Sequence, residues 1–481
     1  MAVDYDLVII GSSVAGIYAA KKAVQLQARV ALVTQSDCLY LPNSYLFNYS
    51  LGTVGKFQNI LKNDFGMLRG NSNDLSLSNT EDWIEDTNLA VQNLNSLPDL
   101  AALGVDVIVG KGKFSKSPHL ELKVKQRCLR ARRFLLATGT NCVPNFMENS
   151  DLQNYLTLKD LPEQKLFNLP INIVIIGSNP TALALAQNLV NFGKEVTLIA
   201  EQNRILPQED NDISILIQAQ LEAIGVKILT QSHVSQIKVI DRQKWLQVGD
   251  RAISADEIIV ANHRQPNIAG LNLAGIDVKY DARRVYVNEK LETTNKNISA
   301  CGELIGGYSL PNIAQYEANI ILKNTLFFPR SKVDYHTLPW AILTQPSLAR
   351  VGLNEKQARQ KYDKIHVIRQ YFSEVGSAPQ VSNVNSGVCK LIVGQQGDIL
   401  GCSIFGDRAS ELITIPALMM QHRIRLDRNP MRGLTSVSIP YIYPDGAEII
   451  ARAIDCFYQQ KIQSDPKLLN RLRSWFSWRK S

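Results

Sequence analysis

Two stretches of this chain share one pattern: a hydrophobic run, a tight turn of small residues and then a helical segment. The first stretch runs from Asp6 to Gly16 and the second from Asn172 to Ala182. Each pattern predicts a strand, a turn and a helix, as in the βαβ unit of a parallel sheet. Backbone N–H groups at such a turn and the positive end of the helix bind pyrophosphate. The pattern therefore predicts two Rossmann-like dinucleotide-binding domains of the α/β class.

The hydrophobic pattern changes past about residue 335. Residues 387–393 and 399–405 alternate in character, and a helical segment follows at 409–422. This pattern predicts an antiparallel sheet packed with helices, and hence a third, α+β domain. From residue 35 to about residue 79 the chain is rich in Asn, Ser, Gly and Leu, which predicts loops and helices around a ligand.

The C-terminal segment 465–481 predicts a basic amphipathic helix. Its apolar residues recur at helical spacing, and its basic residues lie largely elsewhere on the helical wheel. The apolar residues are Leu468, Leu469, Leu472, Trp475 and Phe476, and the basic residues are Lys467, Arg471, Arg473, Arg479 and Lys480. Two interpretations stay open: a terminal helix docked on its own domain, and a helix that contacts a membrane surface or a partner.

Composition bounds the class of protein. A chain of 481 residues with 45% apolar residues can form several domains. No apolar run reaches about 18 residues and no signal peptide precedes the first strand, so we expect a cytoplasmic protein whose only membrane contact would be peripheral. The net charge is +8, but neither basic cluster carries a nucleic-acid recognition motif, so we expect no nucleic-acid partner. The seven cysteines show no paired spacing, and we expect no metal site.

Three further segments point to a known family. Residues 132–139 read Arg-Arg-Phe-Leu-Leu-Ala-Thr-Gly, residues 258–267 read Ile-Ile-Val-Ala-Asn-His-Arg-Gln-Pro-Asn, and residues 298–307 read Ile-Ser-Ala-Cys-Gly-Glu-Leu-Ile-Gly-Gly. In this order they resemble signatures of the two-dinucleotide flavoproteins, the pyridine nucleotide-disulfide oxidoreductases. That family includes glutathione reductase, dihydrolipoamide dehydrogenase and mercuric reductase. Residues 344–352 resemble the opening of the family's dimerisation domain.

The resemblance implies a domain plan. An FAD-binding domain would comprise residues 1–150 and 268–335, split around an NAD(P)-binding-like domain at 151–267. A dimerisation domain at 336–463 would form a homodimer, and the basic amphipathic helix would occupy 464–481.

The resemblance also assigns residues to FAD. The first turn would cradle the pyrophosphate, Gly112 would lie near the adenine, and Ala137 to Gly139 would pack beside the cofactor. Glu303 replaces the family's aspartate and keeps its charge, whereas Thr34 replaces an acid that holds the adenosine ribose and offers a weaker hydrogen bond. The assigned residues are Gly11, Ser12, Ser13, Val14, Ala15, Gly16, Thr34, Gly112, Ala137, Thr138, Gly139, Gly302, Glu303 and Pro311.

The second turn would bind NADH or NADPH. Ala200 replaces the acid typical of NAD enzymes, which leaves Glu201 and Arg204 as the nearest charged groups. An acid favours NAD and an arginine favours the 2′-phosphate of NADP, so the sequence does not choose between the donors. His263 replaces a glycine beside the nicotinamide path. The residues assigned to NAD(P) are Gly177, Asn179, Ala182, Glu201 and Arg204.

The groups that perform thiol chemistry in the family are missing. If Leu41-Pro42 matches the segment after the family's CxxxxC pair, Tyr40 replaces the second cysteine and the first is deleted, which leaves Cys38 as a lone thiol. The same alignment places Ser44 and Ala184 where the family has a lysine near the flavin and its glutamate partner. The C-terminal His-Glu dyad is also absent, because Ile439-Pro440 replaces the family's His-Pro. These departures exclude thiol–disulfide exchange.

We therefore expect an FAD-dependent oxidoreductase that passes electrons from NAD(P)H to a non-disulfide acceptor such as a quinone. The sequence assigns no catalytic residue. Aromatic walls for a quinone could come from Tyr40, Tyr45, Phe47 and Tyr441. The alternatives are a non-catalytic or regulatory flavin- or nucleotide-binding homologue that acts at a membrane or a partner protein, and an enzyme that has lost FAD.

Overall fold

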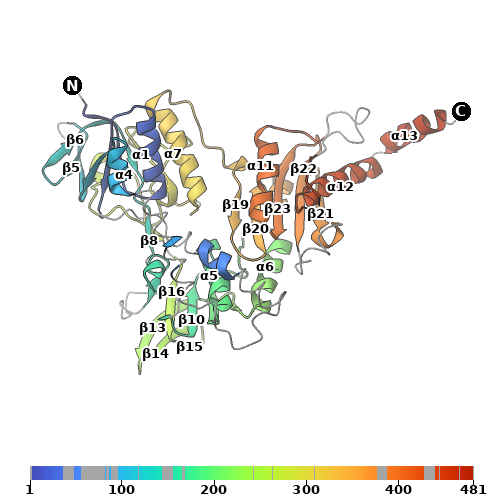
Figure 1. The fold of residues 1–481 in the computed structure, drawn as a ribbon, viewed down its shortest axis with the longest axis horizontal. Helices are drawn as coiled ribbons and strands as arrows, with labels where there is room; N and C mark the ends of the chain where they lie inside the picture. Colours follow the sequence, from blue (N-terminus) through green and yellow to red (C-terminus); the bar gives the residue numbers. More distant parts are fainter. Residues whose placement is uncertain are drawn as a thin grey trace. The chain divides into compact units, whose positions relative to one another are not determined.

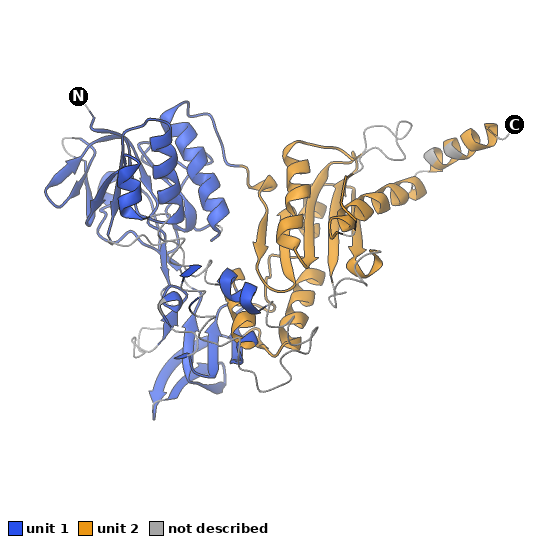
Figure 2. Ribbon diagram, in the orientation of Figure 1, with its two compact units in different colours: residues 1–178, 191–201, 232–333 blue, residues 179–190, 202–231, 334–481 orange. Residues whose placement is uncertain are grey.

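The computed structural model describes most of the chain (Figure 1). The described residues are 3–35, 48–55, 82, 86–87, 96–116, 119–142, 155–164, 168–241, 243–262, 264–307, 309–375, 387–426, 439–443, 445–464 and 466–479. The chain divides into two compact units (Figure 2). Unit 1 comprises residues 1–178, 191–201 and 232–333, and unit 2 comprises residues 179–190, 202–231 and 334–481.

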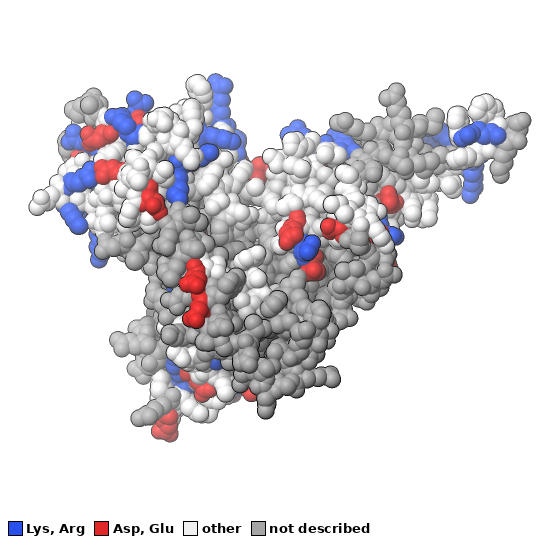
Figure 3. All heavy atoms as spheres, in the orientation of Figure 1, with Lys and Arg blue, Asp and Glu red and all other residues white. Residues whose placement is uncertain are grey.

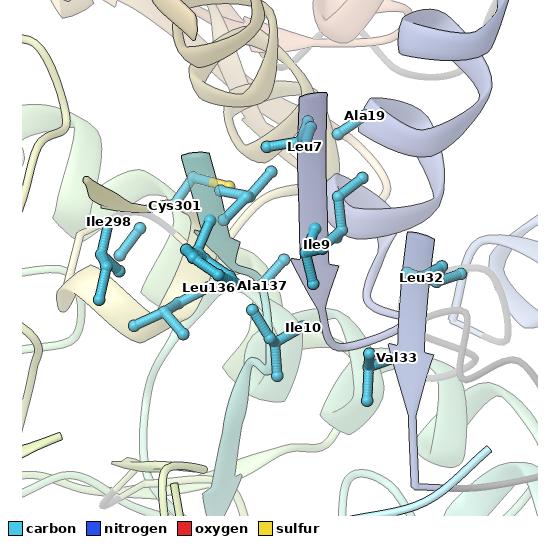
Figure 4. Close-up of a cluster of buried hydrophobic side chains, with 14 of the residues drawn as sticks. Leu7, Ile9, Ile10, Ala19, Leu32, Val33, Leu136, Ala137, Ile298 and Cys301 are labelled. Atoms are coloured by element: carbon cyan, nitrogen blue, oxygen red, sulfur yellow. The ribbon is translucent and has the colours of Figure 1, made fainter. Parts of the chain in front are cut away.

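The first sheet of unit 1 is parallel, with five strands in the order β18-β7-β1-β2-β3. Its strands are β1 (Tyr5–Ile10), β2 (Val30–Thr34), β3 (Asp106–Val109), β7 (Ala131–Leu136) and β18 (Ile298–Ala300). Helices α1 (Val14–Gln25) and α7 (Pro311–Leu326) lie side by side (Figure 1). Side chains such as Leu7, Ile9 and Leu32 are fully buried in its core (Figure 4), as strands covered on both faces require. A strand near residue 300 thus belongs to the sheet that begins at residue 5.

Smaller elements complete this part of unit 1. Three short helices and a three-stranded antiparallel sheet, which follows β3 along the chain, make up these elements. They are α4 (Leu97–Ala102), β4 (Gly112–Ser115), β5 (Glu121–Val124), β6 (Arg127–Leu129), η3 (Ala274–Ile276) and η4 (Gly302–Ile305).

A second parallel arrangement in unit 1 leads into the second predicted turn at Gly177. Strands β11, β10, β16 and β9 neighbour one another in that order. An antiparallel ribbon of β8 and β17 and a three-stranded meander of β13, β14 and β15 accompany them. The bounds are β8 (Thr140–Cys142), β9 (Leu156–Thr157), η1 (Leu161–Glu163), β10 (Asn172–Ile176), β11 (Glu195–Ile199), β13 (Val234–Ile240), β14 (Gln243–Val248), β15 (Arg251–Ala255), β16 (Glu257–Val260) and β17 (Arg264–Pro266).

Unit 2 is built on an antiparallel sheet in the order β19-β20-β23-β22-β21. Helices pack on it around a core that includes Ile404, Ile449 and Phe457. The strands are β19 (Trp340–Ile342), β20 (Ser347–Gly352), β21 (Ile365–Tyr371), β22 (Val388–Gly394) and β23 (Ile399–Gly406). The other elements are α5 (Pro180–Asn191), α6 (Asn211–Ala223), β12 (Lys227–Leu229), η5 (Tyr335–Thr337), α8 (Glu355–Lys361), η6 (Phe372–Glu374), α10 (Ala409–Leu412), α11 (Thr414–Gln421), α12 (Glu448–Ser464) and α13 (Pro466–Trp478).

A buried lysine ties the loop before α6 to this sheet. Lys390 of β22 is 2% exposed, and its Nζ lies 2.9 Å from a carboxylate oxygen of Asp210, of Asp212 and of Glu355. Burial lowers the pKa of Lys390, but hydrogen bonds to Glu355 and the two aspartates outweigh it and raise the pKa above the ordinary value. The ammonium group stays charged and holds three chain segments together.

Candidate functional site

The first predicted turn is tight because two glycines approach the backbone closely. Gly11 has φ +106°, and a Cβ on it would lie 2.3 Å from the carbonyl oxygen of Ala137. A Cβ on Gly16 would lie 2.1 Å from the carbonyl oxygen of Gly11. The Gly11 N–H donates to Val33 at 2.8 Å, which fixes the turn against β2. No other residue type fits at either glycine without moving backbone.

The helix after this turn begins with groups that suit an anion. Ser13 is the N-cap of α1, and its hydroxyl accepts from the Gly16 N–H at 3.4 Å. Val14 and Ala15 follow as the first helical residues, and the first turn holds no acidic residue. Unpaired N–H groups and the positive end of the helix dipole therefore meet no competing carboxylate from this turn.

Thr34 contacts a residue of the turn, which sequence reasoning missed. Its Oγ1 lies 2.9 Å from Oγ of Ser12, and Thr34 is only 3% exposed. The two hydroxyls are neighbours because β1 and β2 pair in parallel and end at the same edge of the sheet. Thr34 therefore has less hydrogen-bonding capacity free for a ribose than the acid that the family places there.

The segment after β7 carries two features that fit a bound group. The Oγ1 of Thr138 is buried and has no hydrogen-bond partner within the described chain. Gly139 has φ +67°, and the space where its Cβ would project is open to 4 Å. An orphaned buried hydroxyl and, at the next residue, open space both fit the FAD that the resemblance implies.

Other residues assigned to FAD lie in three further elements of unit 1, which are η4, α7 and β4. The N–H of Gly302 donates to the buried Glu317 carboxylate at 2.6 Å, and Gly302 has φ +74°. Pro311 is the first residue of α7. A Cβ on Gly112 would lie 3.1 Å from Cδ1 of Leu122, so a side chain there would press on the neighbouring strand β5.

Glu303 is held by three side chains that the sequence did not place near it. Its Oε1 lies 2.5 Å from Nη1 of Arg264 and also accepts from Ser309, and its Oε2 accepts from Thr140 Oγ1 at 2.6 Å. Arg264 lies on β17 and Thr140 on β8, the two strands of one ribbon. Glutamate is one methylene longer than the aspartate it replaces and reaches this ribbon. We name Glu303, Arg264, Ser309 and Thr140 the Glu303 cluster.

Charge and burial oppose each other at the Glu303 cluster. Burial raises the pKa of Glu303, but Arg264 and the hydrogen bonds from Ser309 and Thr140 lower it, and the net shift is downward. Burial lowers the pKa of nearby Lys159, against the raising effect of Glu303. The Lys159 Nζ donates to the Thr140 carbonyl and, at 3.0 Å, to Asn141. The carboxylate is therefore ionised and already partnered at neutral pH.

The second turn repeats the first. Gly177 has φ +122°, and its N–H donates to Ile199 at 2.9 Å, as Gly11 donates to Val33. Asn179 accepts from the Ala182 N–H at 2.9 Å, in the role that Ser13 has at the first turn. Against Gly177 lies the side chain of Asn262, which the sequence did not single out.

The two charged groups proposed for the second nucleotide differ in availability. In unit 2, Arg204 donates from Nη1 to Asn211 at 2.7 Å and from Nη2 to the carbonyls of Pro207 and Glu209 at 3.1 and 3.0 Å. In unit 1, the Glu201 carboxylate is 35% exposed and lies 3.7 Å from Nδ1 of His233. The arginine is committed to its own loop, whereas the glutamate side chain is partly exposed beside His233.

Several predicted residues lie outside the described part of the chain. They are Cys38, Tyr40, Leu41, Pro42, Ser44, Tyr45, Phe47 and His263. Ala184 is 3% exposed within α5. Tyr441, beyond Ile439-Pro440, is described and is 43% exposed.

Comparison with protein families identifies the chain. Residues 5–318 match the family described as pyridine nucleotide-disulphide oxidoreductase, and residues 338–431 match its dimerisation domain. The chain belongs to this family. Members of the family bind FAD and use NAD(P)H, and the presence of the dimerisation domain supports a homodimer. The predicted family and α/β fold with a C-terminal dimerisation domain are thereby confirmed.

Individual relatives share about a quarter of their residues with this family member. It is 28% identical to a mercuric reductase of Staphylococcus aureus over 468 residues, covering 94% of this chain and 83% of that protein. It is 28% identical to a dihydrolipoyl dehydrogenase of Bacillus subtilis over 327 residues, covering 67% of this chain and 71% of that protein.

Solved structures share the fold. The Cu(II) complex of the HOCl-induced flavoprotein disulfide reductase RclA from Escherichia coli aligns with a TM-score of 0.79 at 23% identity, covering 95% of this chain and 100% of that chain. LpdA from Mycobacterium tuberculosis aligns with a TM-score of 0.80 at 20% identity, covering 94% and 99%. Among the described helices, none is long and apolar enough to cross a membrane.

Proposed function

We propose that this family member is an FAD-dependent oxidoreductase that takes electrons from NAD(P)H and passes them to an acceptor other than a disulfide. The observation that carries the proposal is the cysteine count. Before residue 128 the chain has a single cysteine, Cys38, whereas the family's redox pair needs two cysteines after the first βαβ unit. One thiol cannot close an internal disulfide at that position.

Two thiols of unit 1, Cys142 and Cys301, support the same conclusion. Burial raises the pKa of Cys142, against the lowering effect of Arg264 and Lys159. Cys301 is fully buried, and burial raises its pKa well above the ordinary value. A thiol held protonated is a poor nucleophile, so neither residue replaces the missing pair.

FAD would be held by the first turn, by the segment Ala137–Gly139 and by the residues around Gly302. Bound FAD supplies two-electron redox chemistry with the nicotinamide nucleotide. The turn would place N–H donors toward the pyrophosphate, and the free Thr138 hydroxyl would gain a partner. The Glu303 cluster would fix the β8–β17 ribbon rather than offer a free carboxylate. These assignments stay predictions.

For the donor we propose NADH in preference to NADPH. A 2′-phosphate needs a guanidinium that is free to bind it, and Arg204 already makes three hydrogen bonds within its loop. The exposed Glu201 carboxylate can accept from a ribose hydroxyl and repels a phosphate.

For the acceptor we propose a quinone. A quinone needs an apolar slot and no protein thiol. Tyr441, Ile442 and Tyr443 are 43%, 78% and 66% exposed, an unusual run of apolar surface. We propose that this run is covered in the homodimer and contributes aromatic walls to the slot.

The visible absorption spectrum of the purified protein tests the proposal. The band of oxidised flavin should be present, should bleach under anaerobic NADH faster than under NADPH, and should return on addition of a soluble quinone. Bleaching by a dithiol such as dihydrolipoamide would instead indicate that the protein is a disulfide reductase. A flavin band that no donor bleaches would favour the non-catalytic homologue, and no band would favour an enzyme without FAD.

A second proposal concerns the tail, which would contact an anionic membrane surface. Trp475, Phe476 and Trp478 of α13 are 50%, 51% and 67% exposed. Residues 466–481 contain basic residues and no acidic one, and basic side chains are visible on this segment in Figure 3. Exposed aromatics beside basic residues are typical of helices that lie in a membrane interface. The protein would then be peripheral on the cytoplasmic side, where quinones are accessible.

A further inference from the structure

The side chain of Asn262 lies directly against the second nucleotide-binding turn. A Cβ on Gly177 would lie 2.1 Å from Oδ1 of Asn262, 2.4 Å from its Cγ and 3.0 Å from its Nδ2. The amide therefore covers the Cα of the first glycine of the turn. Both residues belong to unit 1.

The first turn shows what is unusual about this contact. The N–H of Ala137 donates to Ile10 at 2.8 Å and the N–H of Ala261 donates to Ile176 at 2.9 Å, so Ala137 and Ala261 are equivalent in the two repeats. The next residues, Thr138 and Asn262, are then equivalent too. At the first turn the nearest atoms to a Cβ on Gly11 are backbone atoms of Ala137 and Thr138. At the second turn a side-chain amide takes that place.

Ser178, the residue after Gly177, also differs from its counterpart at the first turn, and the difference lies in the hydrogen bonding of its hydroxyl. At the first turn the Ser12 hydroxyl is bonded to Thr34. In the second repeat the residue equivalent to Thr34 is Ala200. Thr34 ends the second strand of the first repeat, and Ala200 directly follows the second strand of the second repeat. The backbone carbonyl of each accepts a hydrogen bond from a later segment of the chain. Alanine has no hydroxyl, so the Ser178 hydroxyl lacks the partner that Ser12 has.

Both polar groups are accessible. Asn262 and Ser178 are partly exposed, and within the described residues neither side chain makes a hydrogen bond. An asparagine amide offers two N–H donors, and a serine hydroxyl offers one. Hydrogen bonds from such donors to a charged phosphate are stronger than those between neutral groups.

We propose that Asn262 and Ser178 bind the pyrophosphate of the nicotinamide nucleotide. This assignment rests on the proposed function, because it requires that the second turn binds a dinucleotide. Asn262 and Ser178 are positioning residues for the donor.

Calorimetric titration of the FAD-loaded protein tests the assignment with ADP-ribose, which contains the pyrophosphate, and with AMP, which lacks it. Asn262→Ala should weaken ADP-ribose binding about tenfold, the loss of one hydrogen bond to a charged group, and leave AMP binding within about twofold. Ser178→Ala should act in the same direction. Asn262→Asp should weaken ADP-ribose binding further, and more at low salt, because a carboxylate repels phosphate.

Ser235→Ala, a change at an exposed serine of β13, is the matched control and should leave both ligands unaffected. An unchanged flavin spectrum shows that each variant is folded. The assignment is overturned if Asn262→Ala and Asn262→Asp bind ADP-ribose as tightly as the wild type, while the proposed donor site stands. If the wild type binds no ADP-ribose, the proposed donor site fails and this assignment fails with it.

Discussion

The carboxylate of Glu303 lies 2.5 Å from the guanidinium of Arg264, although 39 residues separate them in the chain. The two side chains are 32% and 23% exposed, so solvent only partly screens the pair. Arg264 comes from the β8–β17 ribbon and Glu303 from η4, beside the last strand of the first sheet. The ion pair therefore fastens the ribbon to the domain that we propose binds FAD.

Glu303→Gln should weaken this attachment. The change keeps the shape of the side chain but leaves Arg264 without a counter-charge, which costs on the order of 1–3 kcal/mol of stability. Because the pKa of Glu303 is lowered in the folded protein, the contribution is present above the ordinary glutamate pKa and is lost as pH falls through the lowered one. Thermal unfolding at pH 7 should show a lower midpoint and earlier release of flavin fluorescence. Equal midpoints for wild type and variant would contradict the role of the pair.

Gly11→Ala should remove FAD. The new Cβ would lie 2.3 Å from a backbone carbonyl, and the positive φ is unfavourable for alanine. We expect the flavin-to-protein absorbance ratio to fall at least about tenfold, equivalent to about 1.4 kcal/mol or more of FAD binding. Gly307→Ala is the control, because no atom lies within 4 Å of that Cβ. A folded Gly11→Ala protein with full flavin content would refute the assignment of the first turn.

Cys38→Ser should have almost no effect on the rate of quinone reduction by NADH. A non-disulfide acceptor needs no thiol, so kcat should stay within about twofold of the wild type. Cys128→Ser, at the exposed cysteine of β6, provides the comparison. Loss of most of the activity in Cys38→Ser alone would show that this thiol takes part in the reaction.

Deletion of residues 465–481 should release the protein from anionic liposomes at low salt without changing its flavin spectrum. Each basic residue near such a surface contributes about 1 kcal/mol, and salt screens that attraction over about 10 Å. Cosedimentation measures the effect, and liposomes of neutral lipid are the control. If the intact protein does not bind anionic liposomes, or if truncation unfolds it, α13 packs on protein instead.

The stability of unit 2 should depend on the protonation of Glu209. This residue is 4% exposed, and burial raises its pKa to about 7, against the opposing charge of Arg350, whose Nε is 3.2 Å away. The folded protein then holds the proton more tightly than the unfolded chain. This group's contribution falls as pH rises from the ordinary glutamate value to about 7, by roughly 3 kcal/mol at most.

Urea unfolding midpoints at pH 5 and pH 8 measure that dependence. The wild type should lose more stability over this range than Glu209→Gln, whose side chain does not titrate. Parallel pH profiles for the two proteins would show that Glu209 keeps an ordinary pKa.

The repeated turns were predictable from the sequence because their determinants are local. Gly11 and Gly177 follow hydrophobic runs within a few residues, and the need for a positive φ is a property of the turn itself. The strands at 388–394 and 399–406 were likewise predictable, because a segment of alternating character marks a strand wherever it lies. The resemblance to a family added FAD, NAD(P)H and the dimerisation domain.

Only the tertiary structure decided the partners of the polar groups. Glu303 with Arg264, Thr34 with Ser12, and Asn262 with Gly177 are pairs whose members lie 39, 22 and 85 residues apart. Hydrophobic periodicity reports which face of an element is buried, but it carries no information about which distant side chain meets that face. Lys390 shows the same limit, since its three carboxylate partners come from two other segments of unit 2. A buried charge requires partners, but the path of the folded chain determines which residues they are.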